Sequence, residues 1–201
     1  MVSSDDAATA SAWPAILTWR SHDDTRIEST RVQLSGNRIK AHGRIAAAAT
    51  AAHPAFSASY DLVTDDNGAT NRLSLTVSVA ERDRQLSISR DEENMWLITD
   101  HEGQSRDSYE GAVDVDVVLS PFFNALPIRR VGLHRNADSV TLPLVYVNLP
   151  DLTVGPATIS YSSPGPESGG GIKLVSPVAD TTVVVDDDGF ILDYPGLAER
   201  I

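Results

Sequence analysis

Residues 73–79 read Leu73-Ser74-Leu75-Thr76-Val77-Ser78-Val79, so an apolar side chain alternates with a hydroxyl at every position. In an extended strand this pattern places leucine and valine on one face and the hydroxyls on the other. A strand of this kind packs one face on a core and exposes the other to water. The stretch therefore predicts an antiparallel sheet that is buried on one side.

Strand-like segments recur along the whole chain, and each is short and bounded by turn residues. They cover residues 15–20, 27–34, 38–45, 55–63, 72–79, 85–89, 95–99, 112–119, 140–148, 157–161, 172–175, 181–185 and 189–194. Helical candidates are confined to residues 45–52 and 195–200. We predict an all-β fold with little helix, in which a single antiparallel sheet curls into a spiral β-roll or open barrel.

Two acidic turn sequences separate pairs of these segments. Asp65-Asp66-Asn67-Gly68 and Asp186-Asp187-Asp188-Gly189 carry the Asn-Gly or Asp-Gly signal of tight hairpins, because glycine accepts the positive φ that such turns need. A calcium loop is the alternative, but the alternate-position acids and the distal glutamate of an EF-hand are missing. We interpret both as hairpin turns.

Composition limits the class of protein. The chain has 201 residues, of which 41% are hydrophobic and 22% charged, as is usual for a soluble globular protein. We expect one β-roll domain over residues 12–201 and a disordered segment over residues 1–11. The N-terminus carries Asp5 and Asp6 and lacks the basic and apolar regions of a signal peptide, and no apolar run is long enough to span a membrane. We therefore expect a cytoplasmic protein without a membrane span.

Charge and motifs exclude several functions. The net charge of −12 opposes binding to nucleic acid. The five histidines show no spacing typical of a zinc site, and the chain has no cysteine. It also lacks a nucleophile elbow, a phosphate loop and a dinucleotide fingerprint. We expect neither a metal nor a cofactor.

Residues 109–130 place unusual polar groups within apolar sequence. Asp114 and Asp116 are two residues apart, so one strand face carries both, with their β-carbons about 7 Å apart. Such a pair can bind a cation, contact sugar hydroxyls or share a proton. The alternative is that this face is only the solvated side of a strand.

The aspartates are followed by an aromatic connection between two prolines. Phe122, Phe123 and Asn124 lie between Pro121 and Pro127, and the prolines restrict how this connection folds. The phenylalanines either gate a cavity or cap the core. The adjacent residues at 129 and 130 are both arginine, and a strand would direct them to opposite faces, so that only one serves the same site as the aspartates.

The first predicted strand ends in Trp19 and Arg20, whose side chains also face opposite ways. Glu28 begins the second strand, and we expect a cross-strand pair between Arg20 and Glu28.

Several motifs together carry a resemblance to a known family. They are Trp19-Arg20, Glu28, Tyr60-Asp61, Trp96, residues 109–130, Tyr146, Pro150-Asp151-Leu152 and the stretch from Val185 to Gly196. In these the chain resembles the putative glycolipid-binding family, bacterial proteins of unknown function. The resemblance implies an all-β spiral roll related to bacterial lipoprotein carriers and a role in holding a glycolipid. It brings no catalytic residues.

The leading functional hypothesis is a non-catalytic protein that holds the acyl chain of a lipid or glycolipid in the cavity of the curled sheet. The candidate ligand contacts are Arg129, Arg130 and Asn124 for a headgroup, Asp114 and Asp116 for sugar hydroxyls, and Phe122, Phe123 and Trp19 for apolar parts. One alternative is a hydrolase acting on a lipid or sugar, with Asp114 and Asp116 as acid and base. The other is a structural or interaction module, in which open sheet edges pair to form a homodimer.

Overall fold

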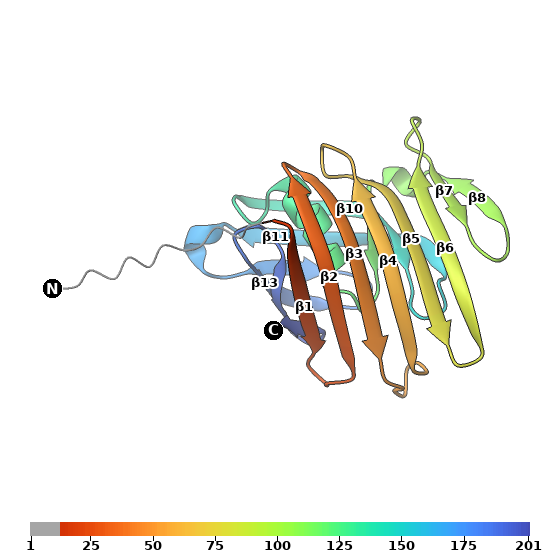
Figure 1. Ribbon diagram of the computed structural model, residues 1–201. Coiled ribbons are helices and arrows are strands. Elements are labelled where there is room, and N and C mark those ends of the chain that lie inside the picture. The colour runs from red at the N-terminus through yellow and green to blue at the C-terminus, as the bar shows by residue number, and fades with distance from the viewer. Residues whose placement is uncertain (1–12) are drawn as a thin grey trace.

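The computed structural model describes residues 13–201, and its strands form one 15-stranded sheet (Figure 1). The predicted disordered segment, residues 1–11, lies outside the described residues. The strands are β1 (Ala15–Ser21), β2 (Arg26–Ser35), β3 (Arg38–Ala47), β4 (Phe56–Thr64), β5 (Thr70–Val79), β6 (Arg82–Arg90), β7 (Trp96–Thr99), β8 (Gln104–Asp107), β9 (Asp114–Val117), β10 (Ala137–Val147), β11 (Val154–Pro164), β12 (Ile172–Val175), β13 (Asp180–Val185), β14 (Ile191–Tyr194) and β15 (Ala198–Arg200).

The sheet curls so that its two halves face each other. Strands run in the order β8 to β1, then β15 back to β9, because β1 pairs with both β2 and β15. In Figure 1 the broad N-terminal strands lie in front and β10, β11 and β13 lie behind them. The ends of the sheet, β8 and β9, do not pair with each other. The predicted all-β curled sheet is confirmed, with one exception in direction, since β9 and β10 run parallel.

Strand β5 shows how alternation determines the two faces. Leu73, Leu75 and Val77 are buried in the core, whereas Ser74 and Thr76 are partly exposed on the outer face. The same alternation continues through β2, β3, β4 and β6. The core therefore lies between the two halves of the sheet, as the pattern predicted.

The short helices lie where connections were expected. A 3₁₀ helix, η2 (Phe122–Asn124), runs directly into α1 (Ala125–Val131). Two other 3₁₀ turns are η1 (Tyr109–Gly111) and η3 (Pro166–Ser168). The two predicted helical candidates are wrong: the first begins inside β3 and continues without helix, and the second ends in β15. In the described residues no helix is long and apolar enough to cross a membrane.

A proline and a glycine explain where helix α1 begins and ends. Pro127 lies in the first turn, where a missing N–H breaks no helical hydrogen bond. Gly132 ends the helix in the left-handed conformation, with φ of 82°, and its N–H donates to the carbonyls of Ile128 and Arg129. Arg129 and Arg130 therefore lie in the last helical turn, so helix geometry and not strand alternation sets the directions of their side chains.

Both predicted hairpin turns are confirmed. Gly68 and Gly189 have φ of 88° and 82°. The Asp65 carboxylate accepts from the backbone N–H groups of Asn67 and Ala69, and Asp186 plays the same part in the β13–β14 turn. These acids stabilise turns, which accounts for their clustering. Within residues 13–201, no group of three or more His, Cys, Asp or Glu side chains is arranged to hold a metal ion.

Aromatic side chains fill the space between the two halves. The ring of Phe122 stacks on those of Tyr60 and Phe190, with centroids 5.8 and 6.1 Å away. Phe123 packs edge-on against Phe122, and both phenylalanines are fully buried. Trp19 contacts the same cluster and donates its indole N–H to the carbonyl of Ile191. These rings form the centre of the core.

A glycine allows one of these rings to cross a strand. Tyr60 on β4 lies opposite Gly43 on β3, which lies opposite Thr30 on β2. Because Gly43 has no side chain, the Tyr60 ring passes over it and its hydroxyl reaches Thr30 and Glu28, each at 2.6 Å. A β-carbon at residue 43 would lie 2.1 Å from Cζ of that ring. Strands β2 and β4 are thus connected across β3.

Candidate functional site

Asp114 is a structural acid. It is 0% exposed, and the Nε of Arg130 lies 3.2 and 3.1 Å from its two oxygens while Nη2 also donates to it. Burial raises the pKa of Asp114, and the contact with Arg130 opposes that rise. The pair connects β9 to the last turn of α1. The solvated-face alternative is wrong for this residue.

Arg129 points away from the aspartates. Its guanidinium lies 5.0 Å from the centre of the Phe190 ring and donates to the carbonyl of Asp188 in the β13–β14 turn. Burial lowers its pKa, although the group remains a cation. Only one arginine serves Asp114, as the sequence indicated, but a helix and not a strand separates the two.

Asp116 has a different environment from Asp114. It lies beside Tyr146 in the parallel register of β9 and β10 and is only partly buried. No side chain in residues 13–201 donates a hydrogen bond to its carboxylate. Burial raises its pKa to about 7, because burial disfavours the charged form of an acid, and a hydrogen bond from the backbone N–H of Val117 opposes that rise. The acid is therefore free to accept hydrogen bonds from a ligand.

The carboxylate of Asp116 belongs to a pocket of about 510 Å³, within the usual size of small-molecule sites. Its walls come from segments far apart in sequence: the end of β9 with the turn that follows it, β10, the β12–β13 connection and the β14–β15 turn. They are lined by Asp116, Val117, Val118, Leu119, Ser120, Asn124, Tyr146, Ser176, Val178, Ala179, Asp180, Thr181, Tyr194, Pro195, Gly196 and Leu197. The lining mixes apolar side chains with a few convergent polar groups.

Three further polar side chains complement Asp116. The Oδ1 of Asn124 accepts from the hydroxyl of Tyr161 at 3.0 Å, which fixes the amide and leaves its nitrogen as a donor. Burial raises the pKa of Tyr146 to about 12 and also raises that of Tyr194. Both tyrosines are therefore neutral phenols that can donate or accept.

The turn at the back of the pocket is anchored in the core. The hydroxyl of Ser120 donates to Oε1 of Glu28 at 2.7 Å, and the same oxygen accepts from Tyr60. Burial raises the pKa of Glu28 to about 7. Leu119, next to this anchor, has φ of 74°, a conformation that is strained for leucine. The Glu28 network thus holds a strained pocket wall in place.

The predicted pair between Arg20 and Glu28 is wrong. Glu28 lies opposite Trp19, and its side chain faces the core. Arg20 points outward and pairs with Glu199 at 2.7 Å and Asp24 at 3.3 Å. The two residues lie on opposite faces of the sheet.

Of the eight ligand contacts expected from the sequence, the pocket brings together Asp116 and Asn124. Asp114 and Arg130 form the structural pair behind it, Arg129 lies against the β13–β14 turn, and Trp19, Phe122 and Phe123 lie in the core. Sequence reasoning missed Tyr146, Tyr194 and Ser176 as pocket residues. Both tyrosines lie in motifs that carry the family resemblance, and that position could have identified them as candidate pocket residues.

The raised pKa of Asp116 predicts a pH-dependent stability. In the unfolded chain this acid loses its proton near its ordinary pKa of 3.8, whereas the folded protein keeps it to about pH 7. The folded state therefore binds the extra proton between these values, and stability falls as pH rises through the window. The full difference in pKa corresponds to about 4 kcal/mol, and we halve it because the side chain is partly exposed to solvent. We therefore expect Asp116→Asn to increase the free energy of unfolding by on the order of 2 kcal/mol at pH 8 and to change it little at pH 4.

Urea unfolding at both pH values measures this difference. Glu28 also titrates with a raised pKa, but it is present in both proteins and its contribution cancels in the comparison. Equal stability of the two proteins at pH 8 would show that the Asp116 carboxylate is well solvated.

Two comparisons with known proteins found a similar protein family and a similar solved structure. The model of a family described as "Putative glycolipid-binding" matches residues 16–200. Among solved structures, the crystal structure of a DUF1089 family protein from Pseudomonas aeruginosa has a TM-score of 0.68 and 22% identity, and the alignment covers 87% of this chain and 92% of that one. At this identity the likeness concerns the fold alone. No curated protein matches the sequence.

Proposed function

This chain belongs to the family described as "Putative glycolipid-binding", and we propose that its pocket around Asp116 binds the sugar headgroup of a glycolipid. The proposal keeps the binding role that the family description names and places it at one site. It assigns no catalytic step.

The observation that carries the proposal is the carboxylate of Asp116. It lines the pocket, its pKa is raised to about 7, and no side chain in the described part of the chain donates to it. An acid in this state lowers the stability of the fold above neutral pH. Groups that reduce stability in this way are typical of functional sites.

The polar groups of the pocket suit a sugar. Asp116 offers acceptors, the amide nitrogen of Asn124 offers a donor, and Tyr146 and Tyr194 offer hydroxyls beside apolar ring faces. A sugar presents hydroxyls that both donate and accept and carbon faces that pack on rings. Among the residues that the structure describes, no arginine or lysine lines this pocket, so the site favours a neutral sugar over a phosphorylated headgroup.

We place the acyl chain of the glycolipid along the apolar side chains that line the pocket. The space between the halves of the sheet is filled by buried side chains, so the proposal places no chain there. Leu119, Val178 and Leu197 line the pocket, and Val178 is 69% exposed. An acyl chain covering these side chains would remove apolar surface from water.

The hydrolase alternative loses one of its two acids. Both oxygens of Asp114 accept from Arg130, so Asp114 is not available to exchange protons with a substrate. Asp116 would then act without the partner that the alternative requires.

Calorimetric titration with a short-chain galactolipid tests the binding proposal. At pH 8, where Asp116 carries its charge, we expect the wild-type protein to bind it and Asp116→Asn to weaken binding by about 10 to 100-fold, because a hydrogen bond to a charged group is lost. Asp138→Asn is the matched control, since Asp138 is exposed on β10 outside the pocket, and its affinity should equal that of the wild type.

A diacylglycerol without sugar separates headgroup recognition from apolar binding. We expect it to bind much more weakly than the galactolipid. Equal binding of the two lipids, unaffected by Asp116→Asn, would contradict recognition of a sugar in this pocket.

A further inference from the structure

The outer face of the N-terminal strands carries a group of unpaired cations, which we call the basic face: Arg31 on β2, Lys40 and Arg44 on β3, and Arg72 on β5. All four are exposed. None lies within 4.0 Å of an acidic side chain in residues 13–201. The chain has 28 acidic and only 16 basic residues, so acids were abundant for pairing. The lack of ion-pair partners for these four cations is therefore a specific property of this face.

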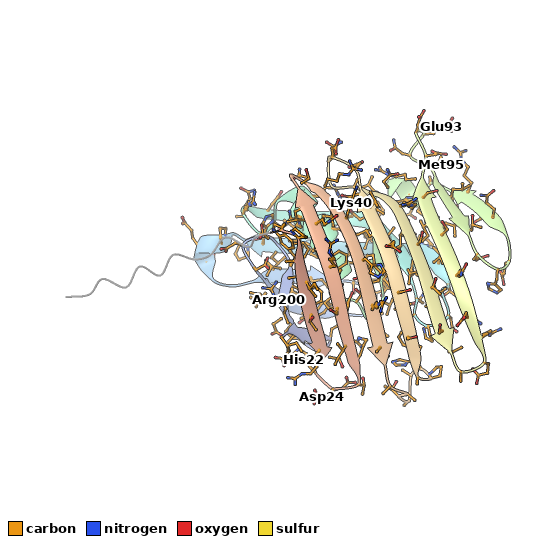
Figure 2. All side chains as sticks on the ribbon, viewed as in Figure 1. His22, Asp24, Lys40, Glu93, Met95 and Arg200 are labelled. Carbon is orange, nitrogen blue, oxygen red and sulfur yellow. The ribbon has the colours of Figure 1, made fainter. Side chains whose placement is uncertain are left out.

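Strand register brings the four cations together. Lys40 and Arg72 both lie opposite Val63, on either side of it, and Arg44 lies opposite Ser59. Because neighbouring strands are about 4.8 Å apart, Lys40 and Arg72 are about 10 Å from each other. This broad face is turned toward the viewer in Figure 2, where Lys40 is labelled.

The rest of the basic face is polar and contains one carboxylate. In the central row, Arg31 lies opposite His42, and His42 lies opposite Asp61. The Nδ1 of His42 is 3.0 Å from the Asp61 carboxylate, so the acid has a local partner. The adjoining outer positions on β5 and β6 carry hydroxyl and amide side chains, namely Ser74, Thr76, Gln85, Ser87 and Ser89, and the exposed Asp83 follows at the next outer position of β6, opposite Ser78. The basic face therefore has an excess of positive charge.

Exposed aliphatic side chains border the basic face. Ile16 on β1 lies opposite Arg31 and is 68% exposed, and Ile27 on β2 is 49% exposed. No Phe, Tyr or Trp occupies the outer positions of the three central rows from β2 to β6, and His42 is paired with Asp61. Cations beside exposed aliphatic groups are typical of proteins that lie on a bilayer surface.

From these observations we infer that the basic face docks on an anionic lipid bilayer. Arg31, Lys40, Arg44 and Arg72 contact lipid phosphates, and Ile16 and Ile27 enter the interface. Nucleic acid fits less well, because single strands need rings such as those of Phe, Tyr or Trp for base stacking. The inference needs no ligand in the Asp116 pocket and does not depend on the proposed function.

Cosedimentation with vesicles tests it. The vesicles contain equal parts of phosphatidylglycerol and phosphatidylcholine without glycolipid, at an ionic strength of about 0.1 M, where the Debye length is about 10 Å. Each cation near an anionic surface contributes roughly fivefold to binding, so we expect Lys40→Glu with Arg44→Glu to weaken partitioning by at least about 25-fold. We also expect binding to fall with added salt and to be absent with phosphatidylcholine alone.

The matched control is Arg82→Glu with Arg135→Glu, which changes the net charge equally. Both arginines are exposed, have no ion-pair partner in the described residues and lie off the basic face. Its partitioning should stay within about threefold of the wild type, because charges beyond a Debye length of the surface are screened. If Lys40→Glu with Arg44→Glu lowers the melting temperature, Lys40→Gln with Arg44→Gln tests the same loss of positive charge.

Three results would overturn the inference. They are no binding of the wild-type protein to anionic vesicles, an equal loss in both double variants, and tighter binding of a single-stranded RNA that depends on Lys40 and Arg44. The last result would assign the basic face to nucleic acid.

Discussion

Replacing Arg130 with methionine is expected to lower the free energy of unfolding by about 3–5 kcal/mol, because it leaves a buried carboxylate without its partner. Asp114 is 0% exposed and both its oxygens accept from Arg130. Methionine keeps the length of the side chain and removes the charge. Urea unfolding at pH 7 measures the loss.

Two further variants show whether the effect arises from the buried charge. Arg106→Met breaks the exposed pairs with Asp91 and Glu93, and its expected loss is much smaller, because solvent screens exposed ion pairs. Adding Asp114→Asn to Arg130→Met should recover part of the stability, because no charge then remains buried. A loss in Arg130→Met as small as that in Arg106→Met would contradict a structural role for this pair.

Gly43→Ala is expected to lower the free energy of unfolding by about 3 kcal/mol or more, since overpacking and a lost hydrogen bond to Glu28 add together. The new β-carbon would lie 2.1 Å from the Tyr60 ring. To avoid it the ring must move, and its hydroxyl then leaves Glu28 and Thr30. Thermal unfolding monitored by circular dichroism measures the effect.

Gly155→Ala is the matched control, because Gly155 also lies in a strand, lacks positive φ and would meet nothing within 4 Å. We expect it to change stability by no more than about 0.5 kcal/mol. Equal effects at the two positions would mean that the Tyr60 ring does not need the space above Gly43.

The class of fold could be predicted because alternation is a local property. In β5 the positions of Leu73, Leu75 and Val77 alone indicate which face is buried. The Asn-Gly and Asp-Gly pairs also predicted the hairpin turns at Gly68 and Gly189, where φ is positive. The parallel pairing of β9 with β10 has no comparable local signal, since it depends on a connection that returns across the sheet.

Because proline occurs both in loops and at the start of helices, the segment after β9 was predicted to be an irregular connection, but it is helical. Pro121 and Pro127 suggested a connection, whereas in the structure they stand at the start of η2 and in the first turn of α1. Both are positions where proline is compatible with a helix. Gly132, immediately after the helix, was the available signal for its end.

The two aspartates show why the site was only partly predicted. Asp114 and Asp116 share one face of β9, and the sequence gives no reason to treat them differently. Burial and the position of Arg130 distinguish them, and both depend on how α1 packs. Tyr146 and Tyr194 reach the pocket from strands far apart in sequence, which spacing alone does not reveal.

The central claim is that the pocket around Asp116 holds the sugar of a glycolipid. A crystal structure of the protein with a short-chain galactolipid tests it most directly. The account predicts density for the sugar ring within hydrogen-bonding distance of the Asp116 carboxylate and the Asn124 amide, with the acyl chain along Val178. A sugar bound elsewhere, with the pocket holding only solvent, would contradict the account.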